Sequence, residues 1–140
     1  MKKLKLDHGI REYALGAGVL RFNPQDPNLY ARFLEMAEKL PEVERTLLEN
    51  SETLPREGIL RLLQQTDSRL KELLNRVFPG NDFDVLLEGV NLLAVGSNGQ
   101  RVITNLLELL EPVLCEGAED FARERTEQAV EKARHRRAGA

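Results

Sequence analysis

Two stretches of the chain space their apolar residues at alternating steps of four and three, and this feature constrains the fold more than any other. The first stretch runs over residues 29–47 and the second over residues 59–77. Such spacing keeps apolar side chains on one narrow face of an α-helix, as helix–helix packing requires. The polar link 50–53 separates the stretches, so we expect an antiparallel helical hairpin. The apolar seams consist of Leu29, Phe33, Met36, Leu40, Val43 and Leu47, and of Ile59, Leu63, Thr66, Leu70, Leu73 and Val77.

Prolines and a capping residue mark the ends of these two helices. Asp26 suits an N-cap and Pro27 suits the first helical position, while the second helix is expected to begin near Pro55. Pro41 lies inside the first stretch. Because proline removes a helical hydrogen bond and clashes with the preceding turn, we expect a kink or a break near Leu40.

Residues 1–25 follow a different pattern, which predicts a small antiparallel sheet. Residues 3–7 alternate between polar and apolar, and two further short runs, 10–15 and 19–23, flank the segment Gly16-Ala17-Gly18. Glycine adopts positive φ readily, so this segment predicts a turn between strands. We expect two or three strands, which are marginally stable alone and must pack on helices or on another chain.

The segment after the hairpin predicts a short helix and a connection. Asp82 can cap a helix over residues 83–88. The apolar segment 89–96 is bounded by glycines and is either a buried connector or a further helical turn. Ser97-Asn98-Gly99 is a turn signal, so the next helix is expected to begin near Gln100.

The last helix is expected to be long and uneven. Pro112 should bend it and Gly117 should loosen it. Beyond Phe121 the periodic apolar residues shrink to alanines, so we expect fraying after Lys132. Its apolar positions are Ile103, Leu106, Leu107, Leu110, Val113, Leu114, Ala118 and Phe121.

These patterns together predict a mainly α fold: a helical hairpin, a further long C-terminal helix and a small N-terminal antiparallel β element. The 140 residues are enough for one domain with a real core. We expect that domain to cover residues 1–132, with residues 1–25 as its β-hairpin-like element. Residues 133–140 are expected to form a flexible basic tail.

Composition and charge narrow the function classes. The 20 basic and 23 acidic residues give a net charge of −3, whereas a nucleic-acid surface is usually clearly basic. Aromatic residues make up 5%, which is few for stacking on bases or sugars. No apolar run follows the N-terminal lysines as in a signal peptide, and none approaches the roughly 20 residues of a membrane span. We expect a soluble, intracellular protein that does not bind a membrane, and the charge balance disfavours nucleic acid as its partner.

Residues that could carry catalysis or bind a metal are sparse. The two histidines, His8 and His135, lie near opposite ends of the chain, and Cys115 lies within an apolar stripe. No Cys/His zinc spacing or Glu-x-x-His motif occurs. The glutamates of the first helix alternate with basic residues, as on a solvated helix face. We therefore expect no enzymatic activity, no cofactor and no metal.

Apolar surface is what remains to account for function. Three long apolar stripes and a marginal sheet give one chain more apolar edge than it easily covers, which favours self-association or partner binding. The densest leucines are flanked by Gly89, Gly96 and Gly99, whose flexibility would let a groove adapt to different helices. We expect the groove residues to be Leu86, Leu87, Leu92, Leu93, Leu106, Leu107 and Leu110.

Several segments resemble one family of bacteriophage and prophage proteins. These segments are residues 18–24 (GVLRFNP), 26–30 (DPNLY), 78–83 (FPGNDF) and 89–91 (GVN). They resemble tail assembly chaperones of long-tailed phages, loosely over residues 10–115. The resemblance implies a mostly helical, self-associating protein of the host cytoplasm. Such a protein coats the long tape-measure protein before the tail tube polymerises and is absent from the virion. No binding residue of the family matches at single positions, so none is carried over.

Two other functions remain open from the sequence. A structural tail or connector subunit that stays in the virion would use the N-terminal strands to extend a neighbour's sheet. A small nucleic-acid-binding regulator would use the basic residues 134–137 as its contact. A tape-measure gene immediately downstream would favour the chaperone, and a repressor or integrase neighbourhood would favour the regulator.

Overall fold

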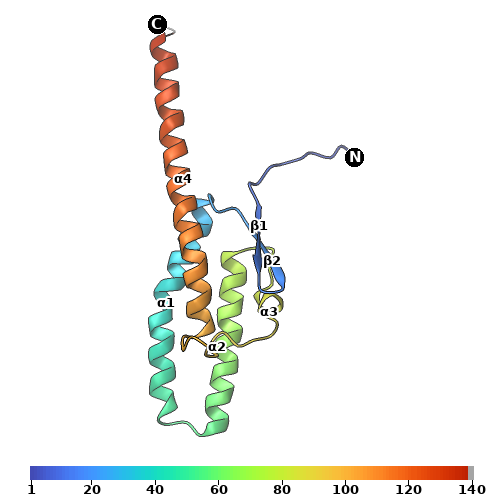
Figure 1. Cartoon of the computed structure of the whole chain (residues 1–140), viewed down its shortest axis with the longest axis vertical. Coiled ribbons are helices and arrows are strands. Elements are labelled where there is room, and N and C mark those ends of the chain that lie inside the picture. The colour runs from blue at the N-terminus through green and yellow to red at the C-terminus, as the bar shows by residue number, and fades with distance from the viewer. Residues whose placement is uncertain (139–140) are drawn as a thin grey trace.

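The computed structural model describes residues 1–138, a mainly helical chain with a two-stranded sheet near its N-terminus (Figure 1). The elements are β1 (Arg11–Leu15), β2 (Gly18–Phe22), α1 (Pro27–Ser51), α2 (Arg56–Val77), α3 (Phe83–Leu86) and α4 (Val102–Ala138). The predicted fold class is confirmed in each part: the helical hairpin, the long C-terminal helix and the small antiparallel β element. Residues 139–140, the end of the predicted flexible tail, lie outside the described residues.

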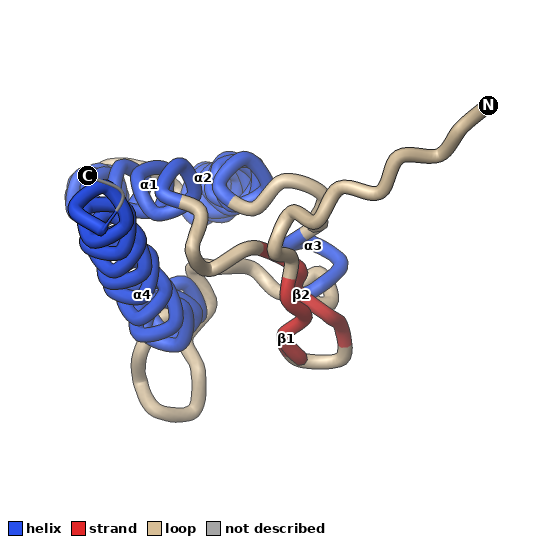
Figure 2. Tube along the Cα trace, turned by 90° about the horizontal axis from the view of Figure 1, so that it is seen from above, coloured by secondary structure: helices blue, strands red, loops and turns tan. Residues whose placement is uncertain are grey.

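The elements form two layers. Helices α1 and α2 lie side by side, and α4, α3 and the β-hairpin all lie on one face of this pair (Figure 2). The opposite face of the α1/α2 pair is covered by no other element of the described chain. The N-terminal residues and the distal part of α4 extend away from the layers (Figure 1).

Helix α1 begins as the sequence predicts but does not break at its internal proline. The Asp26 side chain accepts a hydrogen bond from the backbone N–H of Asn28 (3.0 Å), and Pro27 occupies the first turn. The predicted break near Leu40 is wrong, because α1 runs continuously through Pro41. Pro41 is exposed, so its ring lies away from the core while seam residues before and after it stay packed.

The seams supply much of the helical core. Half of their twelve members are buried, and Leu40, Val43, Leu63 and Leu73 are partly buried against the core. The buried members are Leu29, Phe33, Met36, Leu47, Leu70 and Val77. The alternating spacing therefore predicts the packing face of both helices correctly.

The sheet contains two strands rather than three. β1 and β2 pair antiparallel, with Leu15 opposite Gly18 and Arg11 opposite Phe22. The turn between them needs a positive φ at Gly16 (57°), as in a type II′ turn. Residues 1–10 are exposed and form no strand, so the alternation over residues 3–7 finds no partner within the described chain.

Aromatic stacking joins the sheet to the helices. The Tyr13 ring stacks on Phe22 with centroids 4.6 Å apart, and Phe22 meets Phe78 edge-on at 5.1 Å. Phe78 in turn lies 5.6 Å from Phe83. Since Phe78 caps the end of α2 and Phe83 begins α3, the chain of rings fixes three elements to one another.

The segment between α3 and α4 is a buried connector, one of the two predicted alternatives. Helix α3 ends at Leu86, short of the predicted Glu88, because Glu88 and Gly89 both have positive φ (54° and 75°). Leu92 and Leu93 are buried, and the backbone N–H of Ile103 donates to the carbonyl of Leu92 (2.8 Å). The connector is thereby bonded to the start of α4.

Helix α4 runs unbroken from Val102 to Ala138, through Pro112 and past Lys132. The predicted fraying after Lys132 does not appear, although every side chain over residues 122–137 is exposed. Whether the basic end is flexible in solution stays a prediction. Gly117 does not loosen α4. It is buried and allows the helix to approach the backbone of Pro24.

Gly117→Ala is expected to destabilise the protein by about 1–3 kcal/mol, because a β-carbon at this position would lie 1.9 Å from the carbonyl oxygen of Pro24. Gly58→Ala is the matched control. A β-carbon at Gly58 meets only side-chain atoms at 3.5 Å or more, so alanine there should stabilise α2 by about 0.5–1 kcal/mol. Urea unfolding of both variants measures the difference. Equal stability of the two would contradict the close approach of α4 to Pro24.

Candidate docking surface

The side chains that could bind a metal are dispersed over the part of the chain that the structure describes. Over residues 1–138, no group of three or more His, Cys, Asp or Glu side chains could hold a metal ion. Cys115 is half-buried, and its Sγ lies 3.8 Å from Tyr30 Oη. The hydrogen bond with Cys115 raises the pKa of Tyr30 above its ordinary value. No helix within the described chain is long and apolar enough to cross a membrane.

The leucines predicted to line a client groove are brought together, but mostly inside the core. Leu86, Leu92, Leu93, Leu106 and Leu110 are buried, and their exposed fractions reach at most 8%. Leu87 and Leu107 are partly buried and pack against the same core. The dense leucines therefore belong mainly to the core. Leu93 also lines a hollow of about 300 Å³ that it shares with Leu40 of α1 and Ile103 of α4.

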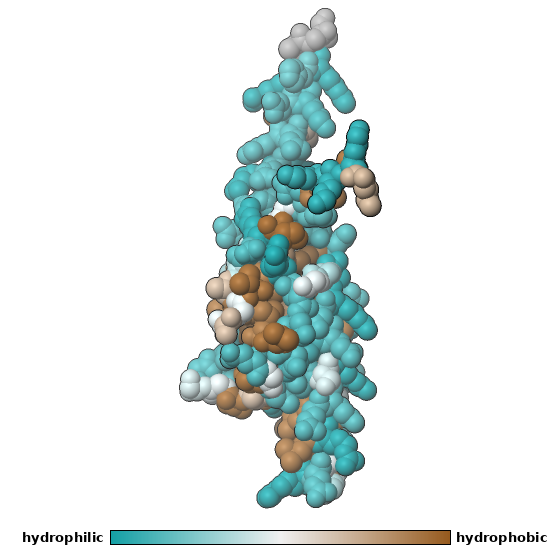
Figure 3. All heavy atoms as spheres, turned by 90° about the vertical axis from the view of Figure 1, so that its right-hand side faces the viewer, coloured by the Kyte–Doolittle hydropathy of each residue, from teal (hydrophilic) through white to brown (hydrophobic). Residues whose placement is uncertain are grey.

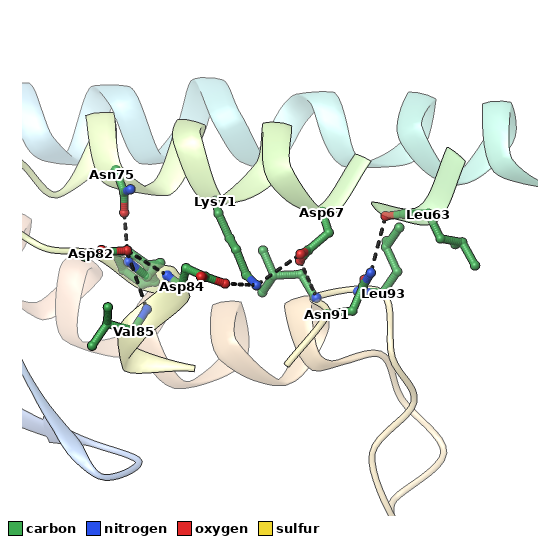
Figure 4. Close-up of polar contacts among 11 residues, drawn as sticks. Leu63, Asp67, Lys71, Asn75, Asp82, Asp84, Val85, Asn91 and Leu93 are labelled. Carbon is green, nitrogen blue, oxygen red and sulfur yellow. Dashed lines mark hydrogen bonds and ion pairs between the residues drawn. The ribbon is translucent and has the colours of Figure 1, made fainter. Parts of the chain in front are cut away.

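A buried lysine that sequence reasoning missed holds this region together. Lys71 lies in α2 between core residues, with 7% of its side chain exposed (Figure 4). Its Nζ lies 3.0 Å from Asp67 Oδ2 and 2.6 Å from Asp84 Oδ1. Asp67 stands one helical turn earlier in α2, whereas Asp84 comes from α3. The ion pairs therefore tie α3 to the middle of α2.

Polar side chains around Lys71 extend this contact to the connector. Asp67 Oδ1 accepts the backbone N–H of Leu92 (2.8 Å), so one carboxylate serves both the lysine and the connector. Asn91 Nδ2 donates to the carbonyl of Leu63 (3.3 Å), and Asn75 Oδ1 accepts the N–H of Phe83 (2.9 Å). Asp67 and Asn75 thereby satisfy backbone N–H groups of the connector and of α3, and Asn91 ties the connector to the backbone of α2.

The titration of Lys71 fits a structural role. Burial by itself lowers the pKa of Lys71, but the hydrogen bonds and charges of Asp84 and Asp67 outweigh it, and the pKa is raised above its ordinary value. The lysine is therefore charged at neutral pH. One signal for it was present in the sequence: Lys71 falls beside the seam, next to Leu70 and four residues after Asp67.

A hollowed apolar surface lies between α1 and α2, on the face opposite α4. Two adjoining hollows of about 370 and 180 Å³ share Lys39 and Leu73 in their walls. We call the two together the outer groove. Its apolar lining consists of Met36, Val43, Leu47, Leu62, Leu70, Leu73 and Val77.

The outer groove has the dimensions and the rim of a helix-binding site. Along α1 it extends over residues 32–47, which is about 22 Å at 1.5 Å per residue. Charged side chains line its edges: Arg32, Lys39, Arg69 and Arg76 against Glu35 and Glu42. The rim therefore carries charges of both signs, with more basic than acidic side chains. Sequence reasoning missed the groove, because the residues that line it are also the predicted seam.

A second apolar surface lies at the β-hairpin and α3. Figure 3 looks onto this side of the molecule and shows apolar side chains gathered there. The exposed ones on or beside these elements are Ile10, Val19, Val85 and Val90, with exposed fractions of 45–70%. This surface has no hollow comparable with the outer groove.

Comparisons of the chain with protein families, curated proteins and solved structures found no match.

Proposed function

We propose that the protein is a tail assembly chaperone of a long-tailed phage or prophage, which binds the tape-measure protein and keeps it soluble before the tail tube forms. One observation supports this most directly: an open apolar groove, about four helical turns long, on a face that no other described element covers. The choice of client rests on the resemblance of residues 18–24, 26–30, 78–83 and 89–91 to that family.

The groove suits an amphipathic helix. A helix lying in such a groove buries an apolar stripe and leaves charged residues against the rim. The excess of basic side chains at the rim favours clients whose stripe is flanked by acidic residues. A tape-measure protein is a long helical chain with apolar stripes, so many copies of a small grooved protein could shield it. Binding of this kind needs no nucleophile, cofactor or metal.

The structure moves the proposed contact away from the predicted leucines. Leu93 and Leu110 are buried on the other face of the α1/α2 pair, whereas Leu62 and Leu73 line the outer groove and are partly buried. We therefore assign client binding to the outer groove.

Leu73→Ala is expected to weaken capture of the co-expressed tape-measure protein by about tenfold, with a smaller loss of stability than a core leucine shows. The measurements are co-purification of the client and the melting temperature. Leu60→Ala is the matched control, since Leu60 is a 55% exposed leucine of the same helix outside the groove.

Leu93→Ala and Leu110→Ala serve as core comparators in the same experiment. Each should cost about 2–5 kcal/mol of stability because the side chains are buried. If capture falls only in proportion to stability across all four variants, the groove assignment fails. If the client fails to co-purify with the unaltered protein, the chaperone proposal fails as well.

A further inference from the structure

The fold covers one edge of the small sheet and leaves the other edge free. At the outer edge of β2, the N–H of Arg21 donates to Asn81 Oδ1 (2.9 Å), and Asn81 Nδ2 donates to the carbonyl of Arg21 (2.8 Å). The side-chain amide thus bonds to Arg21 as the backbone of a third strand would. This edge is closed at its centre to a further strand.

The outer edge of β1 has no such cover. Arg21 faces Glu12 across the hairpin, and because Arg21 points its backbone groups outward, Glu12 does so too. Ala14, two residues on, has the same orientation. No hydrogen bond within residues 1–138 uses the backbone groups of Glu12 or Ala14 on this side. Both residues are exposed, and β1 pairs with β2 alone.

We propose that this edge binds the β1 strand of a second copy of the chain, antiparallel and centred on Tyr13, to form one four-stranded sheet across a two-fold axis. Glu12 of each copy then exchanges both backbone hydrogen bonds with Ala14 of the other, and Arg11 lies opposite Leu15. All residues of β1 are paired. A symmetric pairing of this kind closes after two chains.

The sequence of β1 selects this register. Two strands pair through residues whose backbone N–H and C=O groups point toward each other, and in β1 these are Glu12 and Ala14. The register of the two β1 strands can therefore shift only by steps that keep residues of this orientation opposite one another. Centring on Glu12 places two carboxylates opposite each other, and centring on Arg11 does the same with two guanidinium groups. Centring on Ala14 runs into the turn, where Gly16 has a φ of 57° and is not extended.

The packing of the hairpin explains what the pairing adds. Two strands of five residues are marginal alone, and the inner face of β1 is only partly covered, since Tyr13 and Leu15 remain half-buried. A second β1 doubles the sheet and places Tyr13 of each copy beside the other on that inner face. The free backbone groups, which would otherwise offer an edge to any strand, are satisfied by a self-complementary partner.

Ala14→Pro tests the edge directly. Proline removes the Ala14 N–H, which points to the free edge, and leaves every hydrogen bond within the hairpin in place. Light scattering after size-exclusion chromatography, over a range of protein concentrations, should show a dimer for the unaltered chain and a monomer for this variant. Val19→Pro is the matched control. Val19 lies opposite Ala14 and faces the other edge of the sheet, so it should leave the dimer intact.

A charge pair tests the register in a chain whose fold is not at risk. Ala14 is exposed, so both Ala14→Glu and Ala14→Lys should fold normally by circular dichroism. Glutamate at this position lies opposite Glu12 of the other copy and should raise the dimer dissociation constant at least tenfold, whereas lysine should lower it. An unaltered chain that stays monomeric up to its solubility limit would overturn the proposal. A dimer that responds equally to glutamate and lysine, or equally to the two proline variants, would overturn it too.

Discussion

Phe78→Ala is expected to lower the free energy of unfolding by about 3–5 kcal/mol. The ring is fully buried and lies between Phe22 of β2 and Phe83 of α3, at the end of α2. Its removal leaves a cavity and also breaks two aromatic contacts, each worth about 0.5–1.5 kcal/mol beyond burial. Urea unfolding followed by circular dichroism measures the loss.

Phe121→Ala is the matched control for this substitution. Phe121 lies in α4 where the helix leaves the core, and it is only half-buried. Its loss should cost clearly less than that of Phe78. Hydrogen exchange adds a local readout, because β1 and β2 should lose protection in Phe78→Ala before the helical hairpin does. A loss below about 1 kcal/mol would show that the hairpin does not depend on the ring chain.

Lys71→Met is expected to cost about 3–5 kcal/mol, because it keeps the aliphatic stem but leaves Asp67 without a cation. The side chain of Asp67 is 15% exposed, so its charge is poorly solvated once the lysine is gone. The melting temperature should fall by roughly 10 °C or more. Lys39→Met, the same change at an exposed lysine of α1, should leave it nearly unchanged.

Two further variants show which contact of Lys71 matters. Asp84→Asn should cost at most about 1 kcal/mol, since that carboxylate is 64% exposed and screened by water. Adding Asp67→Asn to Lys71→Met should recover much of the loss, because asparagine still accepts the N–H of Leu92 without a buried charge. If the double variant is less stable than Lys71→Met, the buried charge is not the cause.

The pH dependence of this contact follows from the raised pKa of Lys71. A lysine whose pKa is raised on folding contributes its full stability below the ordinary value of about 10.5. That contribution is lost as the pH rises through the raised value. The Lys71 contact should therefore hold α3 in place at neutral pH and weaken only in alkali.

Helix packing was the part of the structure that the sequence determined most directly. Residues such as Phe33 and Leu70 repeat along a face, and that face is buried whatever the partner, so periodicity alone predicts it. Asp26 and Asp82 were identified as caps because their neighbours in the chain are also their partners in space. The sheet has two strands, one of the two expected numbers, because the alternation over residues 3–7 shows that a segment can form a strand but does not supply a partner.

The candidate site could not be predicted, because its residues are distant in sequence. Lys71 meets Asp84 across 13 positions and Asn81 meets Arg21 across 60, and no local pattern marks such pairs. The outer groove depends on which face of α1 and α2 is left uncovered, and this is decided by where α4 packs. Leu93 and Leu110 are buried, but their spacing in the sequence is equally compatible with a core and with a groove.

The distal part of α4 gives the protein two kinds of helix with different thermal behaviour. Over residues 122–137 the side chains of α4 are exposed, so the helix there depends on backbone propensity and on charge interactions. The basic groups of its last turn stabilise it by interacting favourably with the negative end of the helix dipole. An isolated helix of that length unwinds gradually on heating, whereas α1, α2 and the first half of α4 melt cooperatively with the core. The ellipticity of the protein should therefore decline steadily well below the temperature at which the core unfolds, and this slope comes from one end of one helix.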